Sequence, residues 1–147
     1  MENEIILKWV FKKAPEKVWE FLTNPDLLAK WLMPTNFKPI LGYKFQFQKN
    51  NPLDCTYGGM VSCEIKEILE PKLLSYSWDF DSEEGKPKYH SLVTWHLNPC
   101  SLGTELVLIH SGFIFEEHRI DHNAGWKELL EKLENQIHLE KNEPNQV

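Results

Sequence analysis

Residues 91–126 constrain the fold more than any other part of the sequence. Apolar and polar residues alternate at 92–97, which predicts a strand with one buried face. A turn around Gly103 leads to a second strand that ends near Phe113, and Trp126 lies where the spacing becomes helical. Strands with rings and aliphatic side chains on their inward faces, covered by one amphipathic helix, predict a domain that encloses an apolar interior.

The preceding sequence predicts strands and two short helices in a fixed order. β-branched and aromatic residues favour a first strand at 4–11. Pro15 opens the first helix. Asn24 caps a second helix, with Pro25 at its first position and Pro34 at its end. Further strands are predicted at 43–48, 59–69, 74–80, 89–97 and 104–111, with turns at 58–59, 71–72, 83–87 and 98–99.

The last predicted element is an amphipathic helix at residues 123–139. Apolar residues fall on one side of it and charged residues on the other. Its length, roughly 25 Å at 1.5 Å per residue, is enough to cross a sheet of five or six strands. Short connections imply antiparallel neighbours. The sequence therefore predicts an α+β domain over residues 1–141, with a curved antiparallel sheet of about six strands, and a frayed tail at 142–147.

The charge of the chain limits its partners. The formal net charge is -6 at pH 7 and the sequence pI is about 5.5. Nucleic acids and anionic membranes select basic surfaces, so neither is expected as a partner. The first residues lack the basic flank and apolar run of a signal peptide, and no apolar stretch approaches the roughly 20 residues of a membrane span. We expect a cytoplasmic protein without membrane insertion.

The three cysteines do not predict a disulfide framework or a zinc site. Cys55, Cys63 and Cys100 are odd in number and lack Cys-x-x-Cys spacing. We expect reduced thiols, with Cys63 buried in the strand at 59–69 as a small apolar side chain.

No familiar catalytic motif occurs in the sequence. The carboxylates at 79–84 and 116–117 are typical of solvated loops, and nothing in the sequence pairs two of them as an acid and a base. A phosphate-binding loop, a Gly-x-Ser-x-Gly elbow and a His-Glu-x-x-His helix are absent. We therefore expect no catalytic residue, no metal and no cofactor.

Histidines are the remaining candidates for chemistry. His118 and His122 lie four residues apart near acidic side chains, which would suit a metal site only if that segment is helical. We favour a capping or rim role for His122 at the entrance to the last helix. His110 shares a predicted face with Leu106 and Leu108. A histidine on an apolar face predicts a hydrogen-bonded core residue in preference to a ligand contact or a catalyst.

Several aromatic side chains fall on predicted inward faces, and two interpretations of them stay open. Each ring buries about 150 to 250 Å², so the rings are sufficient to fill a core. Alternatively, a curved sheet around a helix leaves a cavity. Apolar walls with a few polar groups, here the hydroxyls of Tyr43 and Tyr76 and the ring of His110, are typical of small-molecule pockets.

Five motifs occur in order along nearly the whole chain, at residues 14–19 (APEKVW), 28–34 (LAKWLMP), 74–78 (LSYSW), 103–113 (GTELVLIHSGF) and 122–126 (HNAGW). As a set they resemble the START-like, or SRPBCC, helix-grip domains, and among these the AHSA-type homologues of the heat shock protein 90 ATPase activator, in their small stand-alone bacterial form. The resemblance implies a helix-grip fold with a deep hydrophobic cavity between the sheet and the C-terminal helix. Related domains bind lipids or polyketide-like aromatics, cyclise polyketides or stimulate a chaperone ATPase.

We expect non-enzymatic binding of a hydrophobic, aromatic or lipid-like small molecule in that cavity. One alternative is an enzyme of the polyketide cyclase or dehydratase type, in which His110 or a tyrosine moves protons. Another is a co-chaperone-like module that stimulates a heat shock protein 90 ATPase. The sequence makes no prediction of oligomeric state. The predicted ligand contacts are Met33, Tyr43, Phe45, Phe47, Tyr76, Trp78, Trp95, Leu106, Leu108, His110, Phe113, Trp126 and Leu130.

Overall fold

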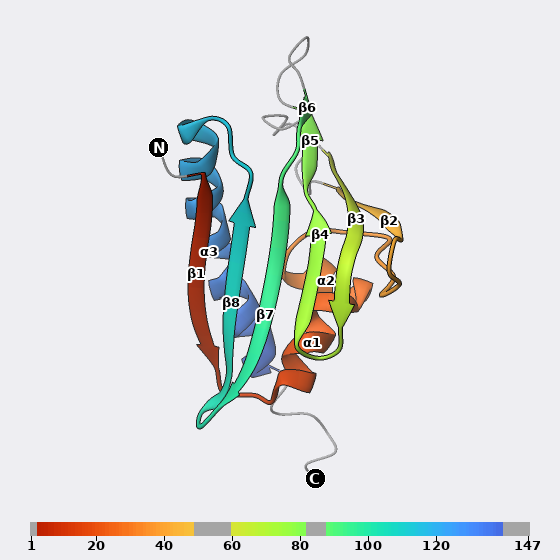
Figure 1. Ribbon diagram of the computed structural model, residues 1–147. Helices are drawn as coiled ribbons and strands as arrows, with labels where there is room; N and C mark the ends of the chain where they lie inside the picture. Colours follow the sequence, from red (N-terminus) through yellow and green to blue (C-terminus); the bar gives the residue numbers. More distant parts are fainter. Residues whose placement is uncertain (1–2, 49–59, 82–87, 140–147) are drawn as a thin grey trace.

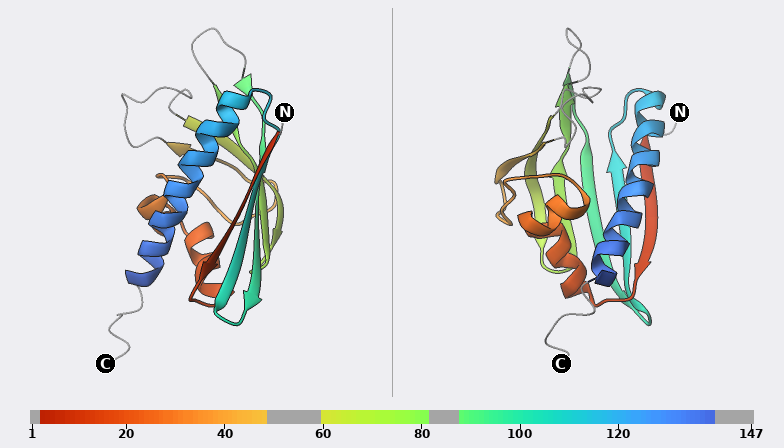
Figure 2. Two further views of the ribbon diagram at one scale, coloured as in Figure 1. Left: turned by 90° about the vertical axis from the view of Figure 1, so that its left-hand side faces the viewer. Right: turned by 180° about the vertical axis from the view of Figure 1, so that it is seen from behind.

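In the described part of the chain, three helices lie on one face of an antiparallel sheet (Figures 1 and 2). The computed structural model describes residues 3–48, 60–81 and 88–139 of the chain. The helices are α1 (Pro15–Thr23), α2 (Pro25–Trp31) and α3 (Glu116–Leu139). The strands are β1 (Glu4–Phe11), β2 (Lys44–Gln48), β3 (Met60–Leu69), β4 (Leu73–Ser77), β5 (Asp79–Asp81), β6 (Lys88–Tyr89), β7 (Leu92–Cys100) and β8 (Gly103–Ser111).

The sheet has the strand order β1-β8-β7-β4-β3-β5-β6, and β2 pairs with β3. Every pairing is antiparallel. Seen from behind, α3 covers the half of the sheet that contains β1 and β8, while α1 and α2 cover the other half (Figure 2, right). This curved sheet around a long C-terminal helix confirms the predicted helix-grip arrangement.

The predicted strands are present, but two of them are interrupted. The segment predicted at 74–80 divides into β4 and β5 at Trp78, and the segment predicted at 89–97 divides into β6 and β7 at His90 and Ser91. The two interruptions lie side by side, because Trp78 N donates to Ser91 O (2.8 Å) and Ser91 N donates to Trp78 O (3.1 Å). Beyond this interruption β5 pairs with β6 on one side and with β3 on the other.

The two short helices begin as the sequence predicts. Proline stands at the first position of each, where the missing N–H costs no hydrogen bond. The Asn24 side chain accepts from Asp26 N (2.8 Å) and Leu27 N (3.4 Å), which caps α2. Helices this short are marginal alone, and they are stabilised by the side chains that they bury. These are Val18, Trp19, Phe21 and Leu22 in α1, and Leu28 and Trp31 in α2.

The predicted start of the last helix was wrong. α3 begins at Glu116, seven residues before the predicted position, so His122 lies inside the helix and does not cap it. Glu116 and Glu117 occupy the first turn, where the helix dipole favours negative charge. Arg119 Nε also donates to Glu116 Oε1 (2.7 Å) across one turn. These local contacts extend the helix through a segment with weak apolar spacing. Residues buried further along are Trp126, Leu130, Leu133 and Ile137.

One predicted turn was also misplaced. β7 continues through Pro99 to Cys100, and the connection to β8 follows at residues 101–102. Gly103, with φ 143°, supplies the backbone conformation that L-residues rarely adopt, so the chain reverses there and not at 98–99. The predicted turns at 58–59 and 83–87, Cys55 and the tail at 142–147 lie outside the described residues.

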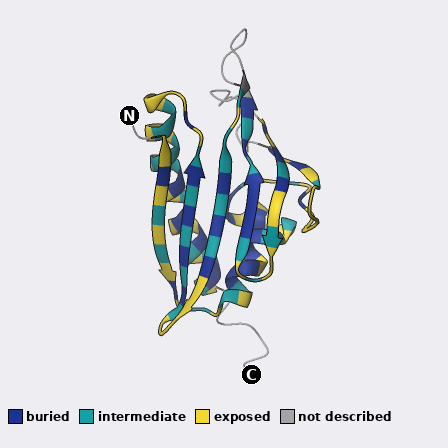
Figure 3. Cartoon of the chain, in the orientation of Figure 1, coloured by how far each residue is buried: buried dark blue, intermediate teal, exposed yellow. Residues whose placement is uncertain are grey.

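Burial alternates along the strands (Figure 3), as the sequence pattern predicts. Cys63 is buried on the inward face of β3, which confirms that prediction, and Cys100 is exposed; both are free thiols. Burial raises the pKa of the Cys63 thiol, and the charge of Asp79 adds to the effect. Among the helices of the described segments, none is both long and apolar enough to cross a lipid bilayer.

Candidate functional site

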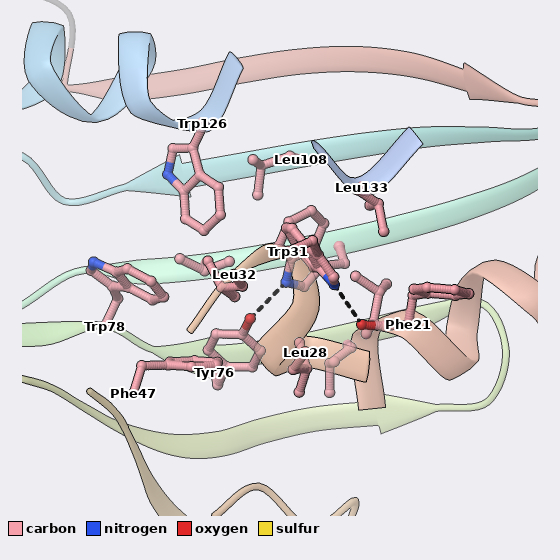
Figure 4. Close-up of a cluster of buried hydrophobic side chains, with 14 of the residues drawn as sticks. Phe21, Leu28, Trp31, Leu32, Phe47, Tyr76, Trp78, Leu108, Trp126 and Leu133 are labelled. Atoms are coloured by element: carbon pink, nitrogen blue, oxygen red, sulfur yellow. Dashed lines mark hydrogen bonds between the residues drawn. The ribbon is translucent and has the colours of Figure 1, made fainter. Parts of the chain in front are cut away.

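The centre of the space between sheet and helices is filled by aromatic rings. Trp95 packs edge-on against Trp31 (ring centroids 6.0 Å apart) and Trp126 (5.5 Å). Its indole Nε1 donates to Tyr76 Oη (2.9 Å), and Trp31 Nε1 donates to Phe21 O (2.9 Å). Figure 4 shows these two bonds among the surrounding side chains. These two buried indole N–H groups therefore have partners, as a packed core requires, whereas the buried Nε1 of Trp78 has none within the described residues.

The predicted ligand contacts lie in three places. Met33, Trp78 and Trp126 line a pocket. Tyr43 is half-buried at the margin of the core. The others are buried side chains of the packed core, and their contact with a ligand stays a prediction. They are Phe45, Phe47, Tyr76, Trp95, Leu106, Leu108, His110, Phe113 and Leu130.

The pocket lies between α3 and strands β3 and β5, and we call it the α3 pocket. Its volume is about 150 Å³. Asp121, His122 and Gly125 contribute from one turn of the helix, and Leu129 from the next. Asp121, Gly125 and Leu129 have the i, i+4, i+8 spacing of a single helix face, and His122 follows Asp121. The predicted helix began at residue 123, so Asp121 and His122 were not predicted to belong to it. The complete lining is Met33, Val61, Trp78, Phe80, Asp121, His122, Gly125, Trp126 and Leu129.

A larger hollow of about 520 Å³ lies beside β2, β3 and β5. Most of its lining side chains are polar and include both signs of charge. Such walls are well solvated and gain little from an apolar molecule. The residues are Asn36, Lys44, Phe45, Gln46, Ser62, Cys63, Glu64, Ser77 and Asp79.

His110 is held in one tautomer by a chain of hydrogen bonds. Trp126 Nε1 can only donate, and it lies 2.9 Å from His110 Nδ1, so Nδ1 is the acceptor. The ring proton is therefore on Nε2, which donates to Ser91 Oγ (2.8 Å). Ser91 Oγ in turn donates to Trp78 O (2.6 Å). Both ring nitrogens are occupied, and the prediction of a hydrogen-bonded core histidine is confirmed.

The environment of His110 favours the neutral ring. Burial lowers its pKa well below the ordinary value of 6.5, and nearby His122 lowers it further. The two rings lie 5.2 Å apart. A proton on Nδ1 would also remove the acceptor for Trp126 Nε1. Protonation of His110 would therefore destabilise the folded state through both the buried charge and the lost hydrogen bond.

We expect this histidine to make folding stability depend on pH. Above pH 6.5 it is neutral in both the folded and unfolded states. Below pH 6.5 the unfolded chain takes up a proton that the folded chain does not, so stability falls as the pH drops, by up to about 1.4 kcal/mol per pH unit. Urea unfolding at several pH values between 7.5 and 5.5 measures this slope.

The matched variant is His110→Gln, which removes the titrating group. In this variant, the slope of unfolding free energy against pH should correspond to the uptake of nearly one proton fewer on unfolding. An equal slope in both proteins would show that the folded state also protonates His110. Should the variant be too unstable, the ring resonances of His110 in the unchanged protein give the same answer, because they should not titrate over this range.

His118 and His122 pack against rings at one end of the α3 pocket. His122 Nδ1 lies 2.9 Å from His118 O, one helical turn back. The His122 ring lies over Phe80 (5.3 Å), and His118 packs edge-on against Tyr89 (4.5 Å). His122 lines the pocket from within α3, and not at the entrance to the helix where its capping or rim role was predicted. Within the described ranges, no group of three or more histidine, cysteine or acidic residues is arranged to hold a metal ion.

Together, the curved sheet, the covering C-terminal helix and the apolar pocket between them define a helix-grip domain. The family model for Activator of Hsp90 ATPase homolog 1-like proteins matches residues 12–137. The chain therefore belongs to that family, as the sequence motifs predict. Among curated protein sequences, none matches the chain significantly.

Solved structures of bacterial proteins share this fold. A Mesorhizobium loti protein is 31% identical, with a TM-score of 0.83, over 96% of this chain and 99% of its own. A Bacillus halodurans protein is 27% identical, with a TM-score of 0.70, over 93% and 99%. The AHSA1 protein of Silicibacter pomeroyi is 22% identical, with a TM-score of 0.78, over 93% and 99%, and shows the shared fold.

Proposed function

We propose that this protein binds a small apolar molecule in the α3 pocket without transforming it. The observation that carries the proposal is a pocket between sheet and helix whose walls are mainly apolar side chains, among them Val61, Trp78, Phe80, Trp126 and Leu129. Apolar surface on a ligand would be removed from water by these walls, which is the main source of affinity for such molecules.

The volume of the pocket supports a ligand of about one ring. Drug-sized ligands occupy pockets of roughly 300 to 1,000 Å³. An apolar cavity of about 150 Å³ in an unrelated protein binds benzene. The α3 pocket has that smaller volume. A monocyclic aromatic or a short branched alkyl group therefore suits it better than a lipid or a folded polyketide chain.

The geometry of the candidate proton-transfer groups favours binding over catalysis. His110 has both nitrogens in hydrogen bonds and a lowered pKa. Burial raises the pKa of Tyr76, whose hydroxyl already accepts from Trp95. Neither group lines the α3 pocket. The two groups considered for the enzyme alternative therefore do not reach the pocket, where the titratable side chains are those of Asp121 and His122. The chaperone alternative has only the family description to support it.

The test is a titration followed by the indole N–H resonances in ¹H–¹⁵N NMR spectra. Toluene, as a single-ring probe, should give saturable shifts at Trp78 and Trp126, which line the pocket. Palmitate, as a lipid probe, should give none there. Absence of saturable shifts with single-ring compounds would contradict the proposed function. Saturation by palmitate alone would contradict the ligand size.

A blocking variant sharpens this test. Gly125 lines the pocket, and a Cβ added to it meets no atom within 4 Å, so a larger side chain has room there. Gly125→Leu should weaken toluene binding at least tenfold by occupying the space. The control is Ala124→Leu, which adds the same side chain at an exposed neighbouring position of the helix. Equal binding by both variants would place the ligand elsewhere.

A further inference from the structure

β1 forms an open edge of the sheet. It pairs with β8 and with no other strand of the described chain, and it ends the strand order. The register runs without interruption from Glu4↔Ser111 to Phe11↔Thr104. Figure 2 (left) shows β1 along the near edge of the sheet. A regular strand with one free side can accept another strand.

Backbone geometry gives the direction of the free hydrogen-bonding groups. In an antiparallel pair, alternate residues direct both N–H and C=O at the neighbouring strand. Gly112 N donates to Asn3 O (3.1 Å), so Asn3 and every second residue after it face β8. The residues between them face away from the sheet. They are Glu4, Ile6, Lys8 and Val10.

The side chains of these four residues are exposed on the face of the sheet opposite the helices. Ile6 is 54% exposed and Val10 is 43% exposed. The inward side of β1 is occupied, since Trp9 Nε1 donates to Glu134 Oε1 of α3 (2.7 Å). Proteins commonly block such an edge with proline, a bulge, an inward charge or charged side chains such as lysine. β1 has no proline, bulge or inward charge, and its charged residues are Glu4 and Lys8.

Glu4 and Lys8 are complementary charges at a spacing that suits self-pairing. Neither makes an ion pair within the described part of the chain. When two copies of β1 run antiparallel with Ile6 facing Ile6, Glu4 of each copy lies opposite Lys8 of the other. Other registers lose this match. With Lys8 facing Lys8, two lysines lie opposite each other, and with Leu7 facing Leu7, Ile6 lies opposite Lys8. Opposite charges across a strand pair stabilise it and like charges oppose it.

We propose that β1 pairs with β1 of a second copy of this chain, about a two-fold axis at Ile6. The two sheets then form one continuous sheet, with the outward backbone groups of Glu4, Ile6 and Lys8 bonded across the axis. A two-fold arrangement uses the same strand on both partners and closes the assembly as a dimer. The proposal does not depend on what occupies the α3 pocket.

Sedimentation velocity of the full chain across a concentration series tests the proposal. The unchanged protein should move from monomer to dimer as its concentration rises. Lys8→Glu places like charges opposite each other twice, and we expect it to raise the dissociation constant about tenfold or more. Glu4→Lys should do the same, and the double variant Glu4→Lys/Lys8→Glu should restore dimerisation. The control is Lys30→Glu, an equal charge change at an exposed position of α2.

Cysteine cross-linking tests the register separately. In a background with Cys55→Ser and Cys100→Ser, Ile6→Cys places two thiols at directly paired positions, within the Cα separation that a disulfide tolerates. Val10→Cys is the control, because its two copies lie at opposite ends of the pair. Oxidation should give a covalent dimer only for Ile6→Cys. A protein that stays monomeric at every concentration, a dimer indifferent to Lys8→Glu, or equal cross-linking at both positions would each overturn the proposal.

Discussion

Gly103→Ala is expected to destabilise the protein by about 3 kcal/mol or more, because the site has neither room nor a suitable backbone conformation for a side chain. A Cβ there would lie 2.4 Å from Phe11 O and 2.7 Å from Lys13 N. Both are backbone atoms, one in the last residue of β1 and one two residues beyond it, so they cannot turn aside as a flexible side chain would. Chemical denaturation followed by circular dichroism measures the loss.

Two other glycines separate the causes of this effect. Gly42 also has a positive φ, of 82°, but a Cβ would meet nothing within 4 Å, so Gly42→Ala should cost only about 1 kcal/mol of backbone strain. Gly125 lies within α3 with open space around it, and Gly125→Ala should stabilise the helix by about 0.5 to 1 kcal/mol. A loss for Gly103→Ala no greater than that for Gly42→Ala would contradict the close contact.

Trp95→Ala is expected to cost about 3 to 5 kcal/mol of unfolding free energy. The side chain is fully buried, and its removal would take away contacts to Trp31 and Trp126. It would also leave a cavity between sheet and helix that its neighbours cannot refill without moving. The same denaturation experiment measures the change, provided that the fitted slope with denaturant is unaltered.

Trp95→Phe isolates the hydrogen bond from most of the packing. A phenyl ring retains part of the aromatic contact but cannot donate to Tyr76 Oη, so a loss of about 1 to 2 kcal/mol is expected. A cost below 1 kcal/mol for Trp95→Ala would mean that the centre of the domain is more loosely packed than the ring contacts indicate, and that Trp95 is available to a ligand.

Much of the fold could be predicted because its determinants are local. Strict alternation at Phe45 and Phe47 identifies the buried face of β2, and the cap at Asn24 marks the start of α2. The role of His110 as a core residue could also be predicted, since it lies on the same buried face of β8 as Leu106 and Leu108. The identity of its partners was not, because Ser91 and Trp126 reach it from other elements.

The candidate site was harder to predict because it depends on how rings and elements pack. Trp78 and Trp95 have the same inward pattern in the sequence, yet Trp78 lines the α3 pocket and Trp95 fills the core. Asp121 and His122 join the pocket only because α3 starts earlier than its apolar spacing indicates. The break in the sheet at Trp78 depends on a long-range pairing with Ser91, to which neighbouring residues give no signal.

The pairing of β1 with β8 has a consequence for how the chain folds. Glu4 pairs with Ser111, so the first of the described strands in chain order cannot pair until the last of them, β8, has been made. Contacts this distant in sequence slow folding, because the intervening loop must close before they yield any stabilisation. Until β8 pairs, the backbone hydrogen-bonding groups on both edges of β1 are unpaired. The edge that β8 later covers can then pair with another chain as readily as the outer edge. Mutations that delay β8, such as Gly103→Ala, should therefore increase aggregation during synthesis more than their effect on equilibrium stability alone would suggest.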